Sequence, residues 1–210
     1  MADRIRIVFD DVAKRFDERI VFRSVSGEAT AGEVLAVTGP NGSGKSTLLA
    51  ILCGLLRPTK GAVRYLAADG GLLERSEWGR VLGVVAPAMS LYEELDAMEN
   101  LRFFARLRGI AGAEETCRGC LERVGLDPGR RTVVAGYSTG MRQRLKIAQA
   151  MLHRPAVLFL DEPGSNLDPA GREWLAGWVR AEVEAATTVV LATNDPVEMQ
   201  WGTRHVALAG

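Results

Sequence analysis

A glycine-rich segment near the N-terminus has the residue types and spacing that phosphate binding requires. Residues 39–47, GPNGSGKST, match the pattern G-x-x-x-x-G-K-[ST] at every fixed position. Its glycines allow the backbone to wrap closely, so that N–H groups point inward at phosphate oxygens. An ordinary glycine-rich turn would not explain a Lys-Ser-Thr at the required offset. The residues expected to bind a nucleotide are Gly39, Pro40, Asn41, Gly42, Ser43, Gly44, Lys45, Ser46 and Thr47.

Two side chains of this segment and two acidic residues further along could act on the phosphates. Lys45 supplies a positive charge for the outer phosphates, and Ser46 supplies an oxygen ligand for Mg²⁺. Asp161 ends the apolar run AVLFLD, where an unpaired charge would be costly, so the same Mg²⁺ is its expected partner. Glu162 follows directly and is well placed to polarise a water for in-line attack. The alternative is that both acidic residues only cap the turn at Pro163.

These residues lie at the ends of segments whose patterns predict a mainly parallel sheet. Three short, continuously apolar runs (33–39, 156–163 and 187–194) are typical of strands that are buried on both faces. Helical patterns follow the first two runs, and alternation of strands and helices predicts the α/β class. Residues 5–16 and 20–29 alternate instead and predict antiparallel strands joined by a turn at 17–19. Segments 61–70 and 80–87 predict two further strands.

The middle of the chain has a helical character. Residues 91–110, 113–126 and 140–154 carry apolar residues at helical spacing. We therefore expect a single domain over residues 1–210, with a core lobe (1–88 and 156–210) and an inserted helical subdomain (89–155). Cys53 is expected to pack as a small hydrophobe. Cys117 and Cys120 could form half of a metal site or a redox pair, but two cysteines one turn apart on a helix is the preferred interpretation, so no metal is assigned to them.

Composition excludes several classes of protein. The 210 residues are 47% hydrophobic and 25% charged, as in an ordinary globular chain. Basic and acidic residues number 26 each, so no overall positive field points to nucleic acid. No apolar run approaches the roughly 18 residues needed to span a bilayer, and the first residues lack the apolar core of a signal peptide. We therefore expect a chain that stays in the cytosol.

The order of the motifs resembles that of the ATP-binding subunits of ABC transporters. Between the phosphate-binding segment and AVLFLDEP lies YSTGMRQRLKIAQAML, which is similar to that family's L-S-G-G-Q signature, and SNLD follows at 165–168. The resemblance implies a Mg-dependent ATPase with an α/β P-loop fold that contains an antiparallel β subdomain and a helical insertion. It implies a homodimer in the ATP-bound state, with Ser138 and Gly140 approaching the γ-phosphate held by the other subunit. Phe16 would stack on adenine, although it could equally be a core residue.

The chain departs from the family pattern at two functional positions. A Gln usually lies near the metal and the attacking water, and the alignment places Ala86 or Pro87 there. The glutamines of the chain are Gln143, Gln149 and Gln200. A switch His usually ends the last strand, where this chain has Asn194. Asn194 could simply form a turn, but the motif order favours a γ-phosphate sensor that never carries a charge near neutral pH. Thr139 and Met141 are smaller departures within the signature.

The resemblance also implies separate integral-membrane permease subunits, so the chain would be peripheral at the cytoplasmic face of the membrane and soluble when isolated. The expected docking surface is the groove between the core and the helical block, near Pro87 to Leu107. Most of the apolar residues of this stretch are expected in the core, with only exposed members near Met89 to Glu94 left for contact. The subtype most resembles the haem exporter linked to cytochrome c maturation. An ABC-2-type drug or polysaccharide exporter and a nucleotide-gated module with weak hydrolysis are the alternatives. A single cassette without long coiled coils disfavours a role in DNA repair or translation.

Overall fold

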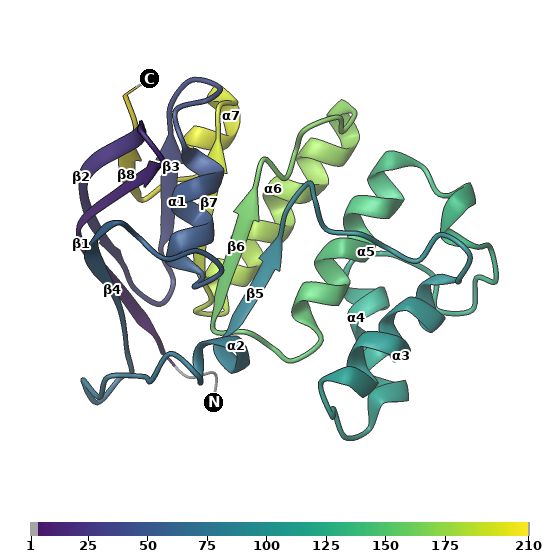
Figure 1. Ribbon diagram of the computed structural model, residues 1–210. Coiled ribbons are helices and arrows are strands. Elements are labelled where there is room, and N and C mark those ends of the chain that lie inside the picture. The colour runs from purple at the N-terminus through teal and green to yellow at the C-terminus, as the bar shows by residue number, and fades with distance from the viewer. Residues whose placement is uncertain (1–3, 210) are drawn as a thin grey trace.

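Five parallel strands form the central sheet of the computed structural model, which describes residues 4–209 (Figure 1). Leu158 and Leu160 face one hydrophobic cluster, whereas Val157 and Phe159 face another, so the sheet is buried on both sides. This confirms the expectation drawn from the continuously apolar runs. In spatial order the strands are β5 (Leu82–Val85), β6 (Val157–Asp161), β7 (Thr188–Thr193), β3 (Val34–Thr38) and β8 (Arg204–Ala207).

An antiparallel sheet packs beside the central one, also as predicted. Its order is β2 (Arg19–Ala29), β1 (Arg6–Phe16) and β4 (Lys60–Leu66). The pairing of Phe16 with Arg19 closes the β1–β2 hairpin at the expected turn. Helix α1 (Lys45–Leu52) lies between the two sheets and shares one hydrophobic cluster with both of them. The fold is therefore the expected α/β arrangement with an antiparallel β portion.

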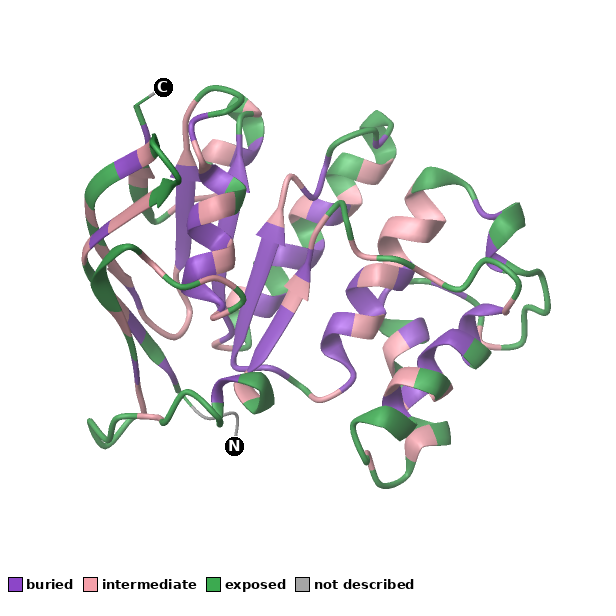
Figure 2. Ribbon diagram, in the orientation of Figure 1, coloured by how far each residue is buried: buried purple, intermediate pink, exposed green. Residues whose placement is uncertain are grey.

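The remaining long helices are α3 (Ala97–Leu107), α4 (Ala113–Arg123), α5 (Thr139–Met151) and α6 (Pro169–Glu184). Of these, α6 packs against the other face of the central sheet and α5 packs beside β5, whereas α3 and α4 pack against each other and against α5 (Figures 1 and 2). Short helical segments are α2 (Trp78–Val81), η1 (Val134–Gly136) and α7 (Pro196–Met199). Residues 89–155 are called the helical region below, and the division into a core lobe and a helical subdomain at these boundaries stays a prediction.

The first helix of this region begins later than its apolar pattern suggests. Asp96 and Glu99 form a reciprocal capping box that starts α3 at Ala97, so residues 89–96 form a loop. The fully buried Asn100 fastens that loop, because its Oδ1 accepts from the backbone N–H of Tyr92 and its Nδ2 donates to the Tyr92 carbonyl. The capping box therefore sets the start of α3 at Ala97, although the helical spacing of the apolar residues begins earlier.

The free cysteines fit packing positions. Cys117 and Cys120 are one turn apart on α4, and Cys117 is fully buried in the hydrophobic cluster. Burial raises the pKa of the Cys117 thiol to about 11, which keeps it protonated near neutral pH. Cys53 is buried at the end of α1. Both observations agree with the interpretation of these residues as part of the packing.

Candidate nucleotide-binding site

Three strand ends bring the predicted site residues to one edge of the central sheet (Figure 1). Thr38 at the end of β3 pairs with Thr193 at the end of β7, and Asp161 at the end of β6 pairs with Ala192. Because all three strands are parallel, the segments that follow them lie at the same edge. The phosphate-binding segment, the acidic pair and Asn194 therefore meet there.

The phosphate-binding segment leads into α1 with a helix end that lacks a side-chain cap. Gly44 is the N-cap residue at φ +97°, and no side chain accepts a hydrogen bond from the first turn. A Cβ on Gly44 would lie 2.5 Å from Val21, so the position requires glycine. The first N–H groups of a helix have no intrahelical partner and carry partial positive charge. This uncapped end fits an anionic phosphate.

Lys45 is held inside this segment beside Glu162. Its side chain is almost fully buried, and its Nζ donates hydrogen bonds to the carbonyls of Gly39 (3.0 Å) and Pro40 (3.2 Å). The same Nζ lies 3.8 Å from Oε1 of Glu162. Because this distance to the Glu162 carboxylate is long for an ion pair, the buried Lys45 ammonium can exchange that partner for a phosphate oxygen.

Ser46 and Asp161 are brought together from opposite halves of the chain. The Ser46 hydroxyl donates to Oδ1 of Asp161 at 3.0 Å. Burial raises the pKa of the Asp161 carboxyl, and the hydrogen bond from Ser46 and the charge of Lys45 oppose that rise. A carboxylate and a hydroxyl oxygen in a partly buried site form a ligand set that suits Mg²⁺.

Glu162 occupies an uncommon backbone conformation at the end of β6. Its φ is +46°, in the left-handed region, where a non-glycine residue costs on the order of 1–3 kcal/mol. Its backbone N–H donates to the carbonyl of Ala192 on β7 (2.8 Å), which holds it in place. The turn thus directs the carboxylate towards Lys45, and Glu162 lines a cavity with the phosphate-binding segment.

This cavity has a volume of about 400 Å³ and is open at the surface. Phe16 lines it with 47% of its surface exposed, and Lys14 Nζ lies 4.6 Å from its ring centroid. An exposed ring of this kind does not fit the alternative of a core residue. Arg19, at the start of β2, also lines the cavity, although sequence reasoning had placed it only in a turn. The other lining residues are Val21, Asn41, Gly42, Gly44, Lys45, Ser46, Thr47 and Glu162.

Asn194 faces the phosphate-binding segment. Its Nδ2 donates to Oδ1 of Asn41 at 2.7 Å, which links the end of β7 to that segment. The turn chemistry belongs to its neighbour, because Asp195 caps α7 by accepting from the N–H of Val197 (2.8 Å). The side-chain amide of Asn194 therefore takes no part in the hydrogen bond that forms the turn.

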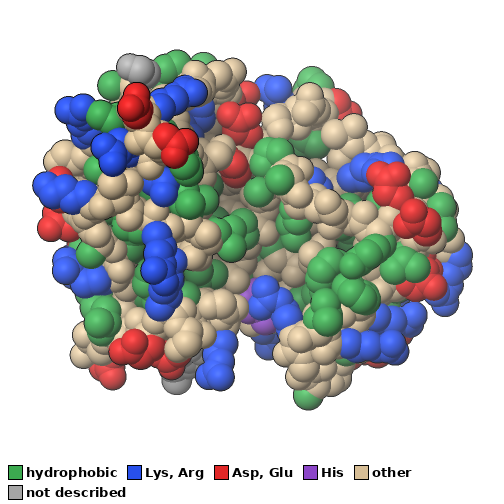
Figure 3. Space-filling model, viewed as in Figure 1, with side chains coloured by type: hydrophobic (Ala, Val, Ile, Leu, Met, Phe, Trp, Pro, Cys, Tyr) green, Lys and Arg blue, Asp and Glu red, His purple; other side chains and the backbone are tan. Residues whose placement is uncertain are grey.

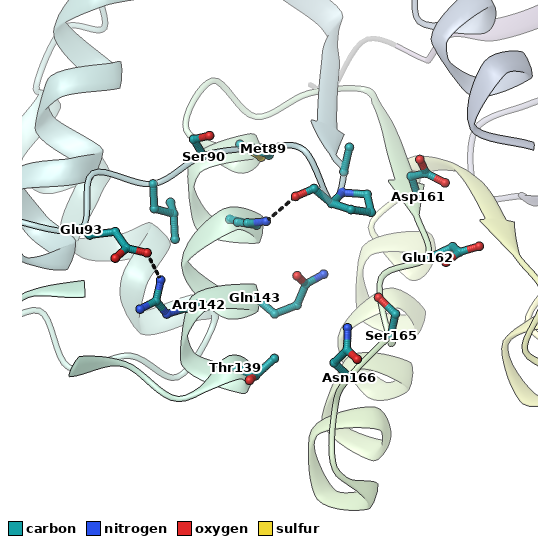
Figure 4. A pocket seen from close by; sticks show the side chains of 14 residues that line it. Met89, Ser90, Glu93, Thr139, Arg142, Gln143, Asp161, Glu162, Ser165 and Asn166 are labelled. Atoms are coloured by element: carbon teal, nitrogen blue, oxygen red, sulfur yellow. Dashed lines mark hydrogen bonds and ion pairs between the residues drawn. The ribbon is translucent and has the colours of Figure 1, made fainter. Parts of the chain in front are cut away.

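A second cavity of about 380 Å³ separates the sheet edge from α5 (Figure 4). Asp161 and Glu162 lie on one wall, and Thr139 and Gln143 on the other. Sequence reasoning missed the position of Gln143, although polar residues at 139, 142, 143 and 146 share one face of α5. The further lining residues are Ala86, Pro87, Met89, Ser90, Leu91, Glu93, Arg142, Lys146, Ser165 and Asn166.

The segment after β5 carries Ala86 and Pro87 at the position where the family pattern implies a Gln, and it lies beside the acidic pair. Ala86 and Pro87 line the second cavity together with Asp161 and Glu162. The carbonyl of Pro87 accepts a hydrogen bond from Lys146 on α5 at 3.2 Å. A backbone contact thus links the helical region to this segment, whose own residues at 86 and 87 carry no amide side chain.

Ser138 and Gly140 lie apart from the phosphate-binding segment of their own chain. Ser138 is the N-cap of α5, and its hydroxyl accepts from the N–H of Met141 at 3.3 Å. Both residues are absent from the walls of the two cavities described above. One chain alone therefore does not join the signature to the phosphate loop.

A phosphate loop between a parallel strand and a helix, with an acidic pair ending a neighbouring strand, defines a P-loop nucleotide-binding domain. A family model described as ABC transporter matches residues 22–165. The chain belongs to the ABC transporter ATP-binding family, and its fold is that of an ABC-type ATPase.

Individual proteins agree with this assignment. The chain is 38% identical to an uncharacterized ABC transporter ATP-binding protein, YdbJ of Bacillus subtilis, covering 86% of this chain and 58% of the relative. It is 38% identical to the daunorubicin resistance ATP-binding protein DrrA3 of Streptomyces coeruleorubidus, covering 92% and 61%. The dimeric post-hydrolysis structure of the ATP-binding cassette MJ0796 with ADP and Pi superposes with a TM-score of 0.80 at 26% identity, covering 96% of this chain and 94% of that chain. The chain spans about 60% of the length of such curated relatives.

Proposed function

We propose that this chain binds ATP with Mg²⁺ and hydrolyses it, as the ATP-binding subunit of an exporter whose membrane subunits are separate chains. The meeting of Lys45, the Ser46–Asp161 pair and Glu162 at one sheet edge carries the proposal. The dimeric relative bound to ADP and Pi supports nucleotide hydrolysis in a pair of such chains. Among residues 4–209, no helix has the length and apolar character needed to cross a bilayer.

The chemistry would divide among these residues as follows. The uncapped end of α1 and Lys45 would hold the phosphates, and Phe16 would stack on the adenine. Ser46 and Asp161 would hold Mg²⁺, which neutralises phosphate charge when it is bound. Glu162 would accept a proton from the attacking water, because its partly exposed carboxylate lines the cavity and lies 3.8 Å from Lys45 Nζ. Ser138 and Gly140 would meet the nucleotide held by a second copy.

Removing Mg²⁺ tests this proposal directly. We expect the full chain to release phosphate from ATP in the presence of Mg²⁺ and to lose that activity with excess EDTA. Because Ser46 and Asp161 are oxygen ligands, activity should return when Mg²⁺ is added back. Phosphate release at the same rate in EDTA would contradict the proposed role of the Ser46–Asp161 pair.

Asn194 should affect turnover more than binding. Replacing it by Ala removes the Nδ2 that reaches Asn41 and leaves the turn bond from Val197 to Asp195 intact. We expect kcat to fall about 10-fold or more, as for the loss of one transition-state hydrogen-bond donor, with the ATP dissociation constant nearly unchanged. Steady-state kinetics and nucleotide titration measure the two quantities. An unchanged kcat would return Asn194 to the role of a turn former.

We propose a drug or antibiotic as the cargo class, in place of haem. The daunorubicin resistance protein supports this choice, whereas the relatives described above give no support to haem export or cytochrome c maturation. The alternative named from the sequence, an ABC-2-type drug or polysaccharide exporter, thus becomes the preferred hypothesis in its drug-exporting form. A transport assay with the chain and its membrane partners in vesicles would separate the two cargoes.

The proposed docking surface for the membrane partner lies on the helical region. Figure 3 shows hydrophobic side chains gathered there, beside the central cleft. Phe103 and Leu107 on α3 are 39% and 69% exposed, so more of this stretch is free than the sequence suggested. Tyr92 stacks edge-to-face on Phe103 and extends the apolar surface onto the loop before α3. Apolar side chains exposed together in this way are typical of an interaction surface.

Leu107→Glu should weaken attachment to the membrane subunits. A charge there would have to be buried against the partner, which is costly. We expect the fraction of tagged chain recovered in washed membranes of its host to fall several-fold. Leu55→Glu is the matched control, because Leu55 is 77% exposed on the loop after α1, away from this surface. Equal recovery of both variants would contradict the assignment.

A further inference from the structure

A buried carboxylate joins the segments that carry Glu162 and Asn194. Glu198, on the short helix α7, is only 5% exposed. Its Oε2 accepts a hydrogen bond from the hydroxyl of Thr193, the last residue of β7 and the neighbour of Asn194. The same hydroxyl oxygen accepts from the N–H of Asp195 (3.0 Å), so its proton is directed towards Glu198. The carboxylate is thus anchored at the very end of the strand.

The other oxygen of Glu198 lies against the segment that follows β6. A Cβ on Gly164 would be 2.1 Å from Glu198 Oε1, so only glycine allows this approach. Gly164 is two residues beyond Glu162 and directly precedes Ser165. Burial raises the pKa of the Glu198 carboxyl, and hydrogen bonding to Thr193 and to the backbone of Gly164 opposes that rise.

A second, more exposed bridge spans the same gap. Arg172 on α6 donates to Oδ2 of Asp195 at 2.8 Å and to the carbonyl of Leu167 at 3.3 Å. Its side chain is 49% exposed, so it contributes little by itself. Of the two bridges, the one through Glu198 is buried and hydrogen-bonded. Losing one partner there would leave a buried polar group unsatisfied, which costs free energy.

We propose that Glu198 is a positioning residue for ATP hydrolysis, which fixes the segment 162–165 relative to the end of β7. This inference rests on the proposed function. A purely space-filling role would not require a hydrogen-bonding side chain, because a buried polar group is costly unless partners such as the Thr193 hydroxyl satisfy it. Glu198 is not among the residues that line the two cavities at the sheet edge. It would therefore act through Glu162 and Asn194.

The test compares Glu198→Ala with Glu198→Gln in the full chain. We expect Glu198→Ala to lower kcat about 10- to 100-fold, as for a small misplacement of a reacting group, with KM within about threefold of the wild-type value. Glu198→Gln retains an oxygen that can accept from Thr193 and should recover most of the lost kcat. Glu173→Ala, on the exposed face of α6, is the control and should behave as wild type.

A second substitution covers the case in which Glu198→Ala does not fold. Thr193→Val keeps the buried shape but removes the hydroxyl donor, and it should lower kcat with KM unchanged, whereas Thr193→Ser should restore kcat. Wild-type kcat in Glu198→Ala or in Thr193→Val would overturn the inference, and so would an equal loss of kcat and of ATP binding. A wild-type chain without turnover would instead contradict the proposed function on which the inference depends.

Discussion

Glu162→Gln should abolish most ATP hydrolysis and leave ATP binding intact. The amide has the shape of the carboxylate but cannot take a proton from water, and general-base catalysis contributes about 10²- to 10⁴-fold. The backbone conformation at φ +46° and the hydrogen bond to Ala192 do not involve the side chain, so the fold should be unchanged. We expect kcat to fall by at least about 100-fold.

The measurement is phosphate release together with the ATP dissociation constant. Glu184→Gln, exposed at the end of α6, is the matched control. Because hydrolysis would dissolve the proposed ATP-bound dimer, the Glu162 variant should also accumulate dimer with ATP, as seen by light scattering. A kcat within a few-fold of wild type would return Glu162 to the role of a turn residue.

Lys45→Ala should instead remove nucleotide binding. Lys45 is the buried cation of the phosphate-binding segment, and a hydrogen bond to a charged group is worth about 1.5–3 kcal/mol. The ATP dissociation constant should therefore rise about 10- to 100-fold, and turnover at fixed ATP should fall with it.

Titration with a fluorescent ATP analogue measures this change. Lys60→Ala is the control, because Lys60 is exposed on β4 and pairs with Asp11, away from the cavity. If Lys45→Ala binds the analogue as tightly as wild type does, the cavity beside Phe16 is not the phosphate site.

Most of the fold could be predicted because local pattern and burial agree. The apolar runs of β3, β6 and β7 are buried on both faces, which is what their composition indicates. The strand β8 was missed, since its four residues are mostly exposed and it is held only by pairing with β3. The start of α3 was placed too early, because the apolar spacing continues through a loop that Asn100 fastens.

The site was predictable where its residues are local in sequence. The phosphate-binding segment and the Asp161–Glu162 pair each carry their own signature, and the structure brings them together as expected. Arg19 and Glu198 could not be found in this way, because each depends on a contact between segments far apart in the chain, which no local pattern reports. Gln143 lies on a polar face of α5 that the sequence pattern shows, but only the fold places that face opposite the acidic pair.

The two departures from the family pattern acquire a physical meaning from the structure. The carbonyl of Pro87, not an amide side chain, connects the segment after β5 to α5 through Lys146. Asn194 contacts the phosphate-binding segment with a neutral amide, at the position where the family pattern implies a switch His. We therefore expect hydrolysis with these two substitutions in place, and without a titrating His at the switch position.

Single-turnover phosphate release distinguishes an ATPase from a module that only binds ATP. Excess chain is mixed with limiting radiolabelled ATP and Mg²⁺, and the labelled phosphate is followed with time. We expect the wild-type chain to convert the bound ATP completely to ADP and phosphate, and Glu162→Gln to retain it as ATP. Tight ATP binding without phosphate release in the wild-type chain would contradict the proposed hydrolysis and leave a nucleotide-gated module that closes on ATP without hydrolysing it.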